Sequence, residues 1–343
     1  MKNNELEKLN INLGLQILRF VLCFWIVIIH CSKIKSCHDK YFHRGFHVPT
    51  FILLSFYFYY NVFSKRNIPK ILYRFQRLLI PYILWPIIVL LVNNFLLSVF
   101  SIGQFNVILN INDIFIQFLI GLRFHPIFYF QFNLIFLSLL FTIIPFIFKS
   151  NFLTMHIYLG LISFFIHFSN INYNFFINYK REFQISLGTL VELMPIAVAG
   201  SVLCSLNILL KIKNFSFHFK LILICIIYFL FEYDIFIYQK GFFYHKVLLN
   251  ILASQILFLF FGSLSFEKIS NFKIIISIII NISKYTGGIY YIHLIFRDYF
   301  RKYSFFFAKG SYSVSVIIYI ICYIFCFIGI KIFKNSKLKY LFI

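Results

Sequence analysis

The first apolar stretch of the chain, residues 13–30, most constrains what this sequence can fold into. It is long enough to cross a bilayer as a helix, yet it contains Arg19 and ends at His30. These two residues are eleven positions apart, which places them within roughly 20° of one helix face and about 16 Å apart in height. Cys23 and Ile26 complete that stripe. A charge inside a span normally faces a bundle interior or a wet cavity, so we expect this face to line a reaction cavity.

The composition predicts a membrane protein. Hydrophobic residues make up 61% of the chain and charged residues 12%, a balance that does not suit a soluble domain with a wet surface. The formal net charge of +22 would suggest nucleic acid in a soluble chain. Here Lys and Arg lie mainly between apolar runs, where lipid headgroups and membrane topology account for them. We predict an all-α, polytopic transmembrane helical bundle that contacts membrane lipids and binds no nucleic acid.

Apolar runs of membrane length recur along the whole chain, and we expect about ten spans. We predict a single membrane domain over 1–343 with no appended soluble domain. A short apolar patch ending near residue 122 is too short to span and is expected to be re-entrant or interfacial. The expected spans are 13–30, 48–63, 78–100, 127–148, 152–168, 187–208, 219–237, 246–264, 285–303 and 311–333.

Ten spans place both termini on one side of the membrane. With the termini inside, the inner segments carry more Lys and Arg than the outer loops, which favours cytoplasmic termini. Arg74 and Arg77 then lie on the cytoplasmic side, and His30 lies near the opposite face. We expect a multi-pass protein of the plasma (inner) membrane.

The seven cysteines show no CxxC pair and no ligand-spaced cluster, so we expect no metal site. HExxH, GxSxG and Walker A motifs are also absent from the sequence. Cys31 and Cys37 share one loop and could form a disulfide, which the sequence leaves open. The other five lie in apolar runs and are expected as small core residues: Cys23, Cys204, Cys225, Cys322 and Cys326.

Two basic groups are candidate site residues. Arg74 and Arg77, at positions i and i+3, share a helix face beside the third span, which suits bidentate capture of phosphates. They equally fit the ordinary basic flank of a span. For Arg19 and His30, the structural alternative is an arginine paired within the bundle and an interfacial histidine.

Three further polar residues lie in or beside spans. His47 opens the second span in the sequence HVPTF and equally fits a plain interfacial residue. His293 follows a close-packing glycine pair inside a span, where it could be functional or a hydrogen-bonded structural histidine. Glu192 could orient a histidine, pair with Arg19, or stay buried and protonated.

In this order, these stretches resemble acyltransferase family 3 of integral membrane O-acyltransferases, over about residues 10–330. The first span is similar to that family's opening helix, and HVPTF through Ser55 is similar to its VP-x-F…SGF segment. Arg74 and Arg77 with the following LLIPY resemble its R-x-x-RL-x-P segment. The stretch from Gly288 to His293 resembles its G-x-YLIH segment.

The sequence departs from the family pattern at two places. Phe56 stands where a glycine is expected after Ser55. The aromatic segment that usually contains tryptophan reads HPIFYF at 125–130. These departures bear on the details of the pocket more than on the class of protein.

The resemblance implies a membrane O-acyltransferase that moves an acyl group, most often acetyl, from cytoplasmic acyl-coenzyme A to a hydroxyl of a cell-surface or secreted carbohydrate. Acetyl-CoA or another acyl-CoA is then the donor substrate, and a carbohydrate or lipid-linked glycan is the acceptor. On this reading His30 is the general base, and Arg19 stabilises developing charge or positions the donor. Arg74 and Arg77 hold the phosphates of the coenzyme.

The same reading assigns four residues to the substrate pocket: His47, Ser55, Glu192 and His293. A transporter or flippase of a lipid-linked glycan is the alternative, in which intramembrane charges gate or relay protons without acyl transfer. A structural or regulatory membrane subunit with degenerate motifs is a third. Retention of His30 and of the Arg74 and Arg77 pair favours the enzyme.

Overall fold

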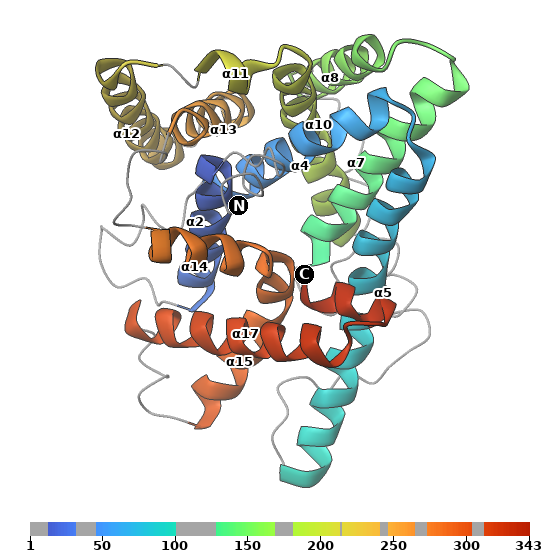
Figure 1. Ribbon diagram of the computed structural model, residues 1–343, viewed down its shortest axis with the longest axis vertical. Helices are drawn as coiled ribbons and strands as arrows, with labels where there is room; N and C mark the ends of the chain where they lie inside the picture. Colours follow the sequence, from blue (N-terminus) through green and yellow to red (C-terminus); the bar gives the residue numbers. More distant parts are fainter. Residues whose placement is uncertain are drawn as a thin grey trace, which may run out of the picture.

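The computed structural model describes residues 13–31, 46–100, 128–168, 181–212, 215–240, 246–264, 273–303 and 312–343. Every regular element in this described part is a helix, which confirms the all-α prediction (Figure 1). The predictions for Cys37, for the patch ending near 122 and for 125–127 lie outside the described residues.

The helices keep the labels of Figure 1. They are α2 (Leu13–Cys31), α4 (His47–Ser64), α5 (Ile68–Phe100), α7 (Phe128–Ile147), α8 (Phe152–Phe168), α10 (Arg181–Ser205), α11 (Ile208–Ile212), α12 (Phe217–Lys240), α13 (Lys246–Gly262), α14 (Lys273–Ser283), α15 (Thr286–Tyr303), α17 (Tyr312–Ile332) and the 3-10 helix η3 (Lys337–Phe342).

Each predicted span overlaps one of these helices, with one large change of boundary. Helix α5 begins at Ile68 instead of near 78, so the arginine pair lies inside the helix and not before it. Pro81 and Pro86 also lie inside α5. Proline is tolerated in membrane helices because neighbouring groups satisfy the freed backbone. The span predicted at 285–303 is α15, a helix separate from α14.

The described helices suit a membrane. Four of those that the structure describes are long and apolar enough to cross one: Leu13–Cys31, Tyr129–Ile147, Gly188–Ser205 and Tyr312–Ile332. The count of ten spans therefore stays a prediction. Large apolar side chains also lie on the outer surface, such as Phe229 of α12, which is 75% exposed. Cys225, on the same helix, is exposed, so the prediction that it is a core residue is wrong because α12 turns this face outward.

Helix α2 lies at the centre of the bundle and contacts α4, α13, α14, α15 and α17 (Figure 1). Leu15, Leu18 and Leu22 of α2 belong to a core built with α4, α7 and α10. Cys23 and Val27 belong to a second core built with α15, α17 and the C-terminal segment. Helix α2, with its polar stripe of Arg19, Cys23 and His30, thus packs against both hydrophobic cores.

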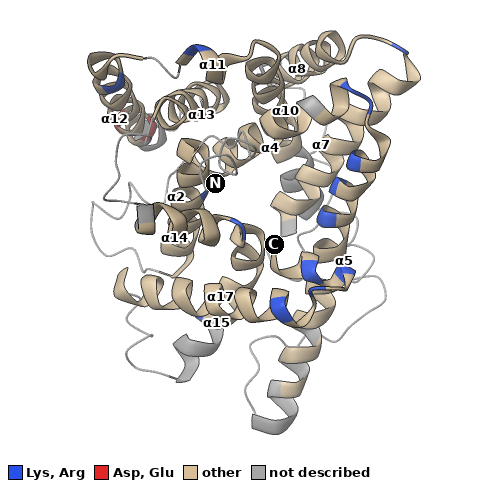
Figure 2. Cartoon of the chain, in the orientation of Figure 1, with Lys and Arg blue, Asp and Glu red and all other residues tan. Residues whose placement is uncertain are grey.

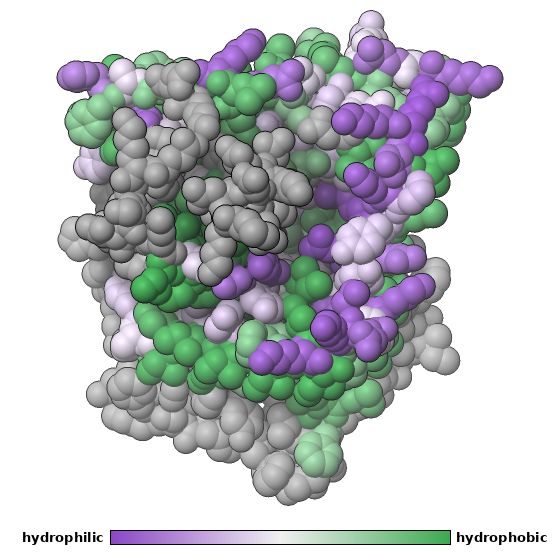
Figure 3. All heavy atoms as spheres, viewed as in Figure 1, coloured by the Kyte–Doolittle hydropathy of each residue, from purple (hydrophilic) through white to green (hydrophobic). Residues whose placement is uncertain are grey.

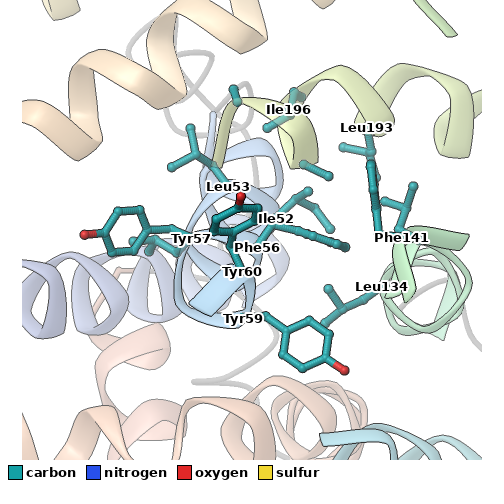
Figure 4. Packing of buried hydrophobic residues seen from close by; sticks show 14 of the residues in the cluster. Ile52, Leu53, Phe56, Tyr57, Tyr59, Tyr60, Leu134, Phe141, Leu193 and Ile196 are labelled. Carbon is teal, nitrogen blue, oxygen red and sulfur yellow. The ribbon is translucent and has the colours of Figure 1, made fainter. Parts of the chain in front are cut away.

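The first core fixes α4 against α7 and α10 (Figure 4). Phe56 of α4 is fully buried, with its ring centroid 5.0 Å from that of Phe141 on α7. Gly200 lets α10 approach closely, because an added Cβ would clash with the backbone carbonyl of Leu53. Small residues at such crossings are typical of membrane helix packing. The position of α4, which carries two predicted site residues, is therefore tightly defined.

The C-terminal segment, 336–343, packs back into the bundle against α5, α15 and α17. The indole Nε1 of Trp85 donates a hydrogen bond to the carbonyl oxygen of Leu341 at 3.0 Å. A Cβ on Gly288 would lie 2.8 Å from Cα of Phe342. The glycine of the predicted close contact thus makes room for this segment.

Candidate active site

The polar stripe of α2 faces α15 along a continuous seam. Nη2 of Arg19 donates to Oγ1 of Thr286 at 3.2 Å, and Sγ of Cys23 donates to the carbonyl oxygen of Thr286 at 3.6 Å. Farther along both helices, Nη1 of Arg297 donates to the carbonyl oxygen of His30 at 3.4 Å. The first and last contacts join residues separated by the same 267 positions, so α2 and α15 run parallel and in register.

Two histidines meet on this seam. The ring centroids of His30 and His293 are 5.3 Å apart, with 38° between the ring planes. His293 is fully buried, and its Nδ1 lies 3.1 Å from the carbonyl oxygen of Ile289. Its Nε2 is buried and has no hydrogen-bond partner among the described residues. The predicted base and a predicted pocket residue are therefore neighbours.

His47 lies at the same end of the bundle. Its ring centroid is 5.9 Å from that of Trp25 on α2, and it interacts electrostatically with His30. Its Nδ1 is buried without a partner in the described part of the chain. Three histidines from α2, α4 and α15 are thus brought together, although they are far apart in the sequence.

Arg74 points into the bundle instead of toward the membrane edge. Its Nη2 donates to the hydroxyl oxygens of Ser55 at 2.9 Å and of Ser138 at 3.3 Å. Its guanidinium carbon lies 3.9 Å from the centroid of the Tyr59 ring. A planar guanidinium can bond and stack in this way, whereas an ammonium group cannot. Ser55, predicted in the pocket, therefore belongs to the arginine end of the site.

Arg19, Arg74 and Arg77 lie near one another, and we call this part of the site the arginine level. Arg77 interacts electrostatically with both Arg19 and Arg74. Among the residues that the structure describes, no carboxylate forms an ion pair with any of the three. Lys and Arg lie along the first half of α5 and at the C-terminal segment beside it (Figure 2), and hydrophilic residues gather on that side of the surface (Figure 3). Partly buried cations without acidic partners are suited to bind an anion.

Helix α4 extends from the arginine level to the histidines at the other end of the site, which we call the histidine level. His47, Phe51 and Ser55 follow one another every four residues and so share one face. These three are partly exposed, whereas 49, 50, 52–54, 56 and 57 are buried. Because α4 carries its histidine first and its serine last, it runs opposite to α2, where Arg19 precedes His30. The two helices thus both extend from the arginines to the histidines, over about 12 to 16 Å.

Aromatic rings lie between the two levels. The ring centroids of Phe51 and Phe130 are 6.4 Å apart, and those of Phe130 and Tyr290 are 5.4 Å apart. The Tyr290 ring in turn lies 6.2 Å from that of His293. Phe130 comes from the segment HPIFYF, so three of the sequence motifs meet through these rings.

Glu192 of α10 lies beside Tyr129, with which it interacts electrostatically. It does not pair with Arg19, whose hydrogen bonds among the described residues go to Gln16 and Thr286. The alternative in which Glu192 neutralises Arg19 is therefore wrong. The carboxylate is partly exposed and neighbours the aromatic rings through Tyr129.

A family model described as an acyltransferase domain matches residues 12–340, nearly the whole chain. The chain belongs to this family, acyltransferase family 3. It is a membrane acyltransferase. No curated protein and no solved structure matched the chain.

Two contact residues of this acyltransferase are not among the site residues predicted from the sequence. Thr286 bonds Arg19, and Arg297 bonds the backbone of His30. Thr286 and Arg297 are eleven positions apart, the spacing of Arg19 and His30. That shared spacing in two of the predicted spans is a signal that the sequence contains, because it places matching polar groups at matching heights.

Phe56, which replaces the expected glycine of the acyltransferase pattern, packs against Arg74. The guanidinium carbon of Arg74 lies 5.8 Å from the Phe56 ring centroid. The Phe56 ring also packs against that of Phe141, with 5.0 Å between the ring centroids. The departure from the family pattern is thus accommodated by aromatic packing, and Arg74 keeps its bond to Ser55.

Proposed function

We propose that this acyltransferase transfers an acyl group, most simply acetyl, from acyl-coenzyme A to a hydroxyl of a cell-surface or secreted carbohydrate, or of its lipid-linked precursor. The observation that carries the proposal is the division of one site into two levels. Arg19, Arg74 and Arg77 form one level, and His30 and His293 form the other. A long donor molecule with an anionic head and a reactive tail needs such a site.

The arginine level suits the coenzyme. Guanidinium groups bind phosphates through paired hydrogen bonds, and these three have no carboxylate partner among the described residues. Arg74 is already held by Ser55 and Ser138, so it loses little freedom on binding. An extended pantetheine arm would then run past Phe51 and Tyr290 toward His30, about 16 Å away.

The histidine level suits the chemistry. A sugar hydroxyl is a weak nucleophile, and His30 accepts its proton as the oxygen attacks the thioester carbonyl. The carbon–sulfur bond then breaks, and His30 returns the proton to the departing thiolate. The products are the carbohydrate ester and free coenzyme A. Arg19 positions the donor from the opposite end of the same helix face.

The two levels also fit a defined topology. We place the arginine level at the cytoplasmic side, where acyl-CoA is available, and His30 near the opposite face. This requires the ten spans and cytoplasmic termini predicted from the charge distribution, in the plasma (inner) membrane. Family membership favours this enzyme over a transporter or flippase, since a flippase needs no donor site.

The test of the proposed function compares surface glycans of cells with and without this protein by mass spectrometry. We expect acyl esters on a carbohydrate only when the protein is present. The purified protein in liposomes should also move labelled acetyl from acetyl-CoA to that carbohydrate. Identical glycan acylation in both cell lines, together with no transfer by folded protein, would refute the proposal.

A further inference from the structure

The hydrogen bonds of His293 fix which of its ring nitrogens carries the proton. Nδ1 lies 3.1 Å from the carbonyl oxygen of Ile289, and a carbonyl can only accept. Nδ1 must therefore be the donor, which leaves Nε2 of the neutral ring as an acceptor. That nitrogen is buried and has no partner among the described residues. A buried acceptor of this kind calls for a donor.

The ring of His30 is placed to supply that donor. Its centroid lies 5.3 Å from that of His293, compared with 6.2 Å for the ring of Tyr290. Imidazole rings at this separation bring their edge nitrogens to hydrogen-bonding distance with a small rotation. A histidine that acts as a base uses one ring nitrogen and keeps an N–H on the other, and that N–H can donate to a neighbour.

We propose that His293 is a positioning residue for His30. Its Nε2 accepts a hydrogen bond from one ring N–H of His30, so that the other ring nitrogen of His30 faces the acceptor hydroxyl. When His30 takes the hydroxyl proton, the resulting cation keeps its N–H directed at His293, and no proton passes between the rings. This inference rests on the proposed function, since it requires His30 to be the base.

Arg297 keeps the two histidines together. It lies four residues after His293 on α15, and its Nη1 donates to the backbone carbonyl of His30 in the last turn of α2. Carbonyl groups in the last turn of a helix lack partners within that helix, so this bond costs α2 no internal bond. The same side chain thus joins the ends of the two helices that carry the histidine pair.

The test is a set of substitutions at His293, each made with His30 intact and with His30→Ala. Glutamine keeps an acceptor near the position of Nε2, whereas asparagine is too short and leucine has none. With His30 intact, we expect His293→Leu and His293→Asn to lower kcat roughly 10-fold to 100-fold, and His293→Gln to recover much of it. The Kd for acetyl-CoA should not change, because the donor head is bound at the arginine level. In the His30→Ala background none of the three should have a further effect.

His156→Gln is the matched control. His156 is a second fully buried histidine, bonded to Ser201 and to the carbonyl oxygen of Phe141, away from the histidine pair. Its replacement should lower the melting temperature and leave kcat of the folded fraction unchanged. If His293→Leu does not fold, His293→Asn against His293→Gln makes the same comparison.

Two results would overturn the positioning role while leaving the proposed function intact. One is full kcat in His293→Asn. The other is the same loss of kcat in the His30→Ala background as with His30 intact, which would mean that His293 acts on the substrate independently. Full transfer by His30→Ala would refute His30 as the base, and the positioning role with it, but would leave acyl transfer itself standing. The proposed function fails only if the folded parent protein transfers no acyl group.

Discussion

Arg74 on α5 donates a hydrogen bond to Ser55 on α4 at 2.9 Å, and this contact joins the arginine end of the site to the helix that leads to the histidines. The Arg74 side chain is therefore hydrogen-bonded inside the bundle and does not lie at the flank of a span. This distinguishes it from the exposed Lys70, one turn earlier on the same helix.

The first prediction concerns donor affinity. Arg74→Ala and Arg77→Ala should each weaken acyl-coenzyme A binding by about 1.5 to 3 kcal/mol, because each removes a charge-assisted contact with phosphate. Isothermal titration with purified protein measures this directly. Lys70→Ala removes an exposed charge from the same helix and should have little effect. Unchanged acyl-coenzyme A affinity in both arginine variants would mean that the pair does not bind the donor and only sets the orientation of the span in the membrane.

A second prediction concerns the departure from the family pattern. Phe56→Gly restores the expected glycine, yet it should destabilise the protein by about 3 to 5 kcal/mol, because it empties a fully buried site between Phe141 and Arg74. Thermal unfolding in detergent measures the loss. Phe58→Ala, on the same helix but with 42% of its side chain exposed, is the control and should cost much less. A Phe56→Gly variant as stable as the parent protein would mean that the Phe56 ring does not stabilise the fold.

The sequence predicted the elements well because hydrophobic runs of membrane length allow few other structures. It also predicted that Arg19 and His30 share a face, since helical geometry alone decides that. It predicts the start of α5 too late, because two charged residues just before an apolar run usually mark its flank. In the structure Arg74 donates hydrogen bonds to Ser55 and Ser138 inside the bundle, and no local pattern encodes partners so far away in the chain.

The histidine pair shows the same limit. His30 and His293 were each predicted as site residues, but nothing local indicated that they touch. Their contact depends on the parallel register of α2 and α15. For Glu192, a contact that the sequence allowed does not form, because Arg19 donates its hydrogen bonds to Gln16 and Thr286. Pairing between helices is set by tertiary packing and not by spacing within one of them.

A third prediction concerns orientation in the membrane. In a protein without native cysteines, Lys70→Cys at the arginine level should be protected from a membrane-impermeant maleimide added to intact cells, and should react after the cells are opened. Ser36→Cys, in the segment 32–46 that the sequence predicts to lie outside, should react from outside. The physical reason is the excess of Lys and Arg on the cytoplasmic side. External labelling of Lys70→Cys would reverse the topology and remove the proposed donor path.

The most direct test of the central claim is transfer of labelled acetyl from acetyl-coenzyme A to carbohydrate by His30→Gln. Glutamine keeps polarity and hydrogen bonding but cannot take up a proton near neutral pH. Acetyl-CoA affinity and folding should match those of the parent protein, since Arg19, Arg74 and Arg77 are untouched. We expect transfer to fall by roughly 10²-fold to 10⁴-fold, as in His30→Ala. Full transfer by His30→Gln would contradict the account, because the base would then lie elsewhere.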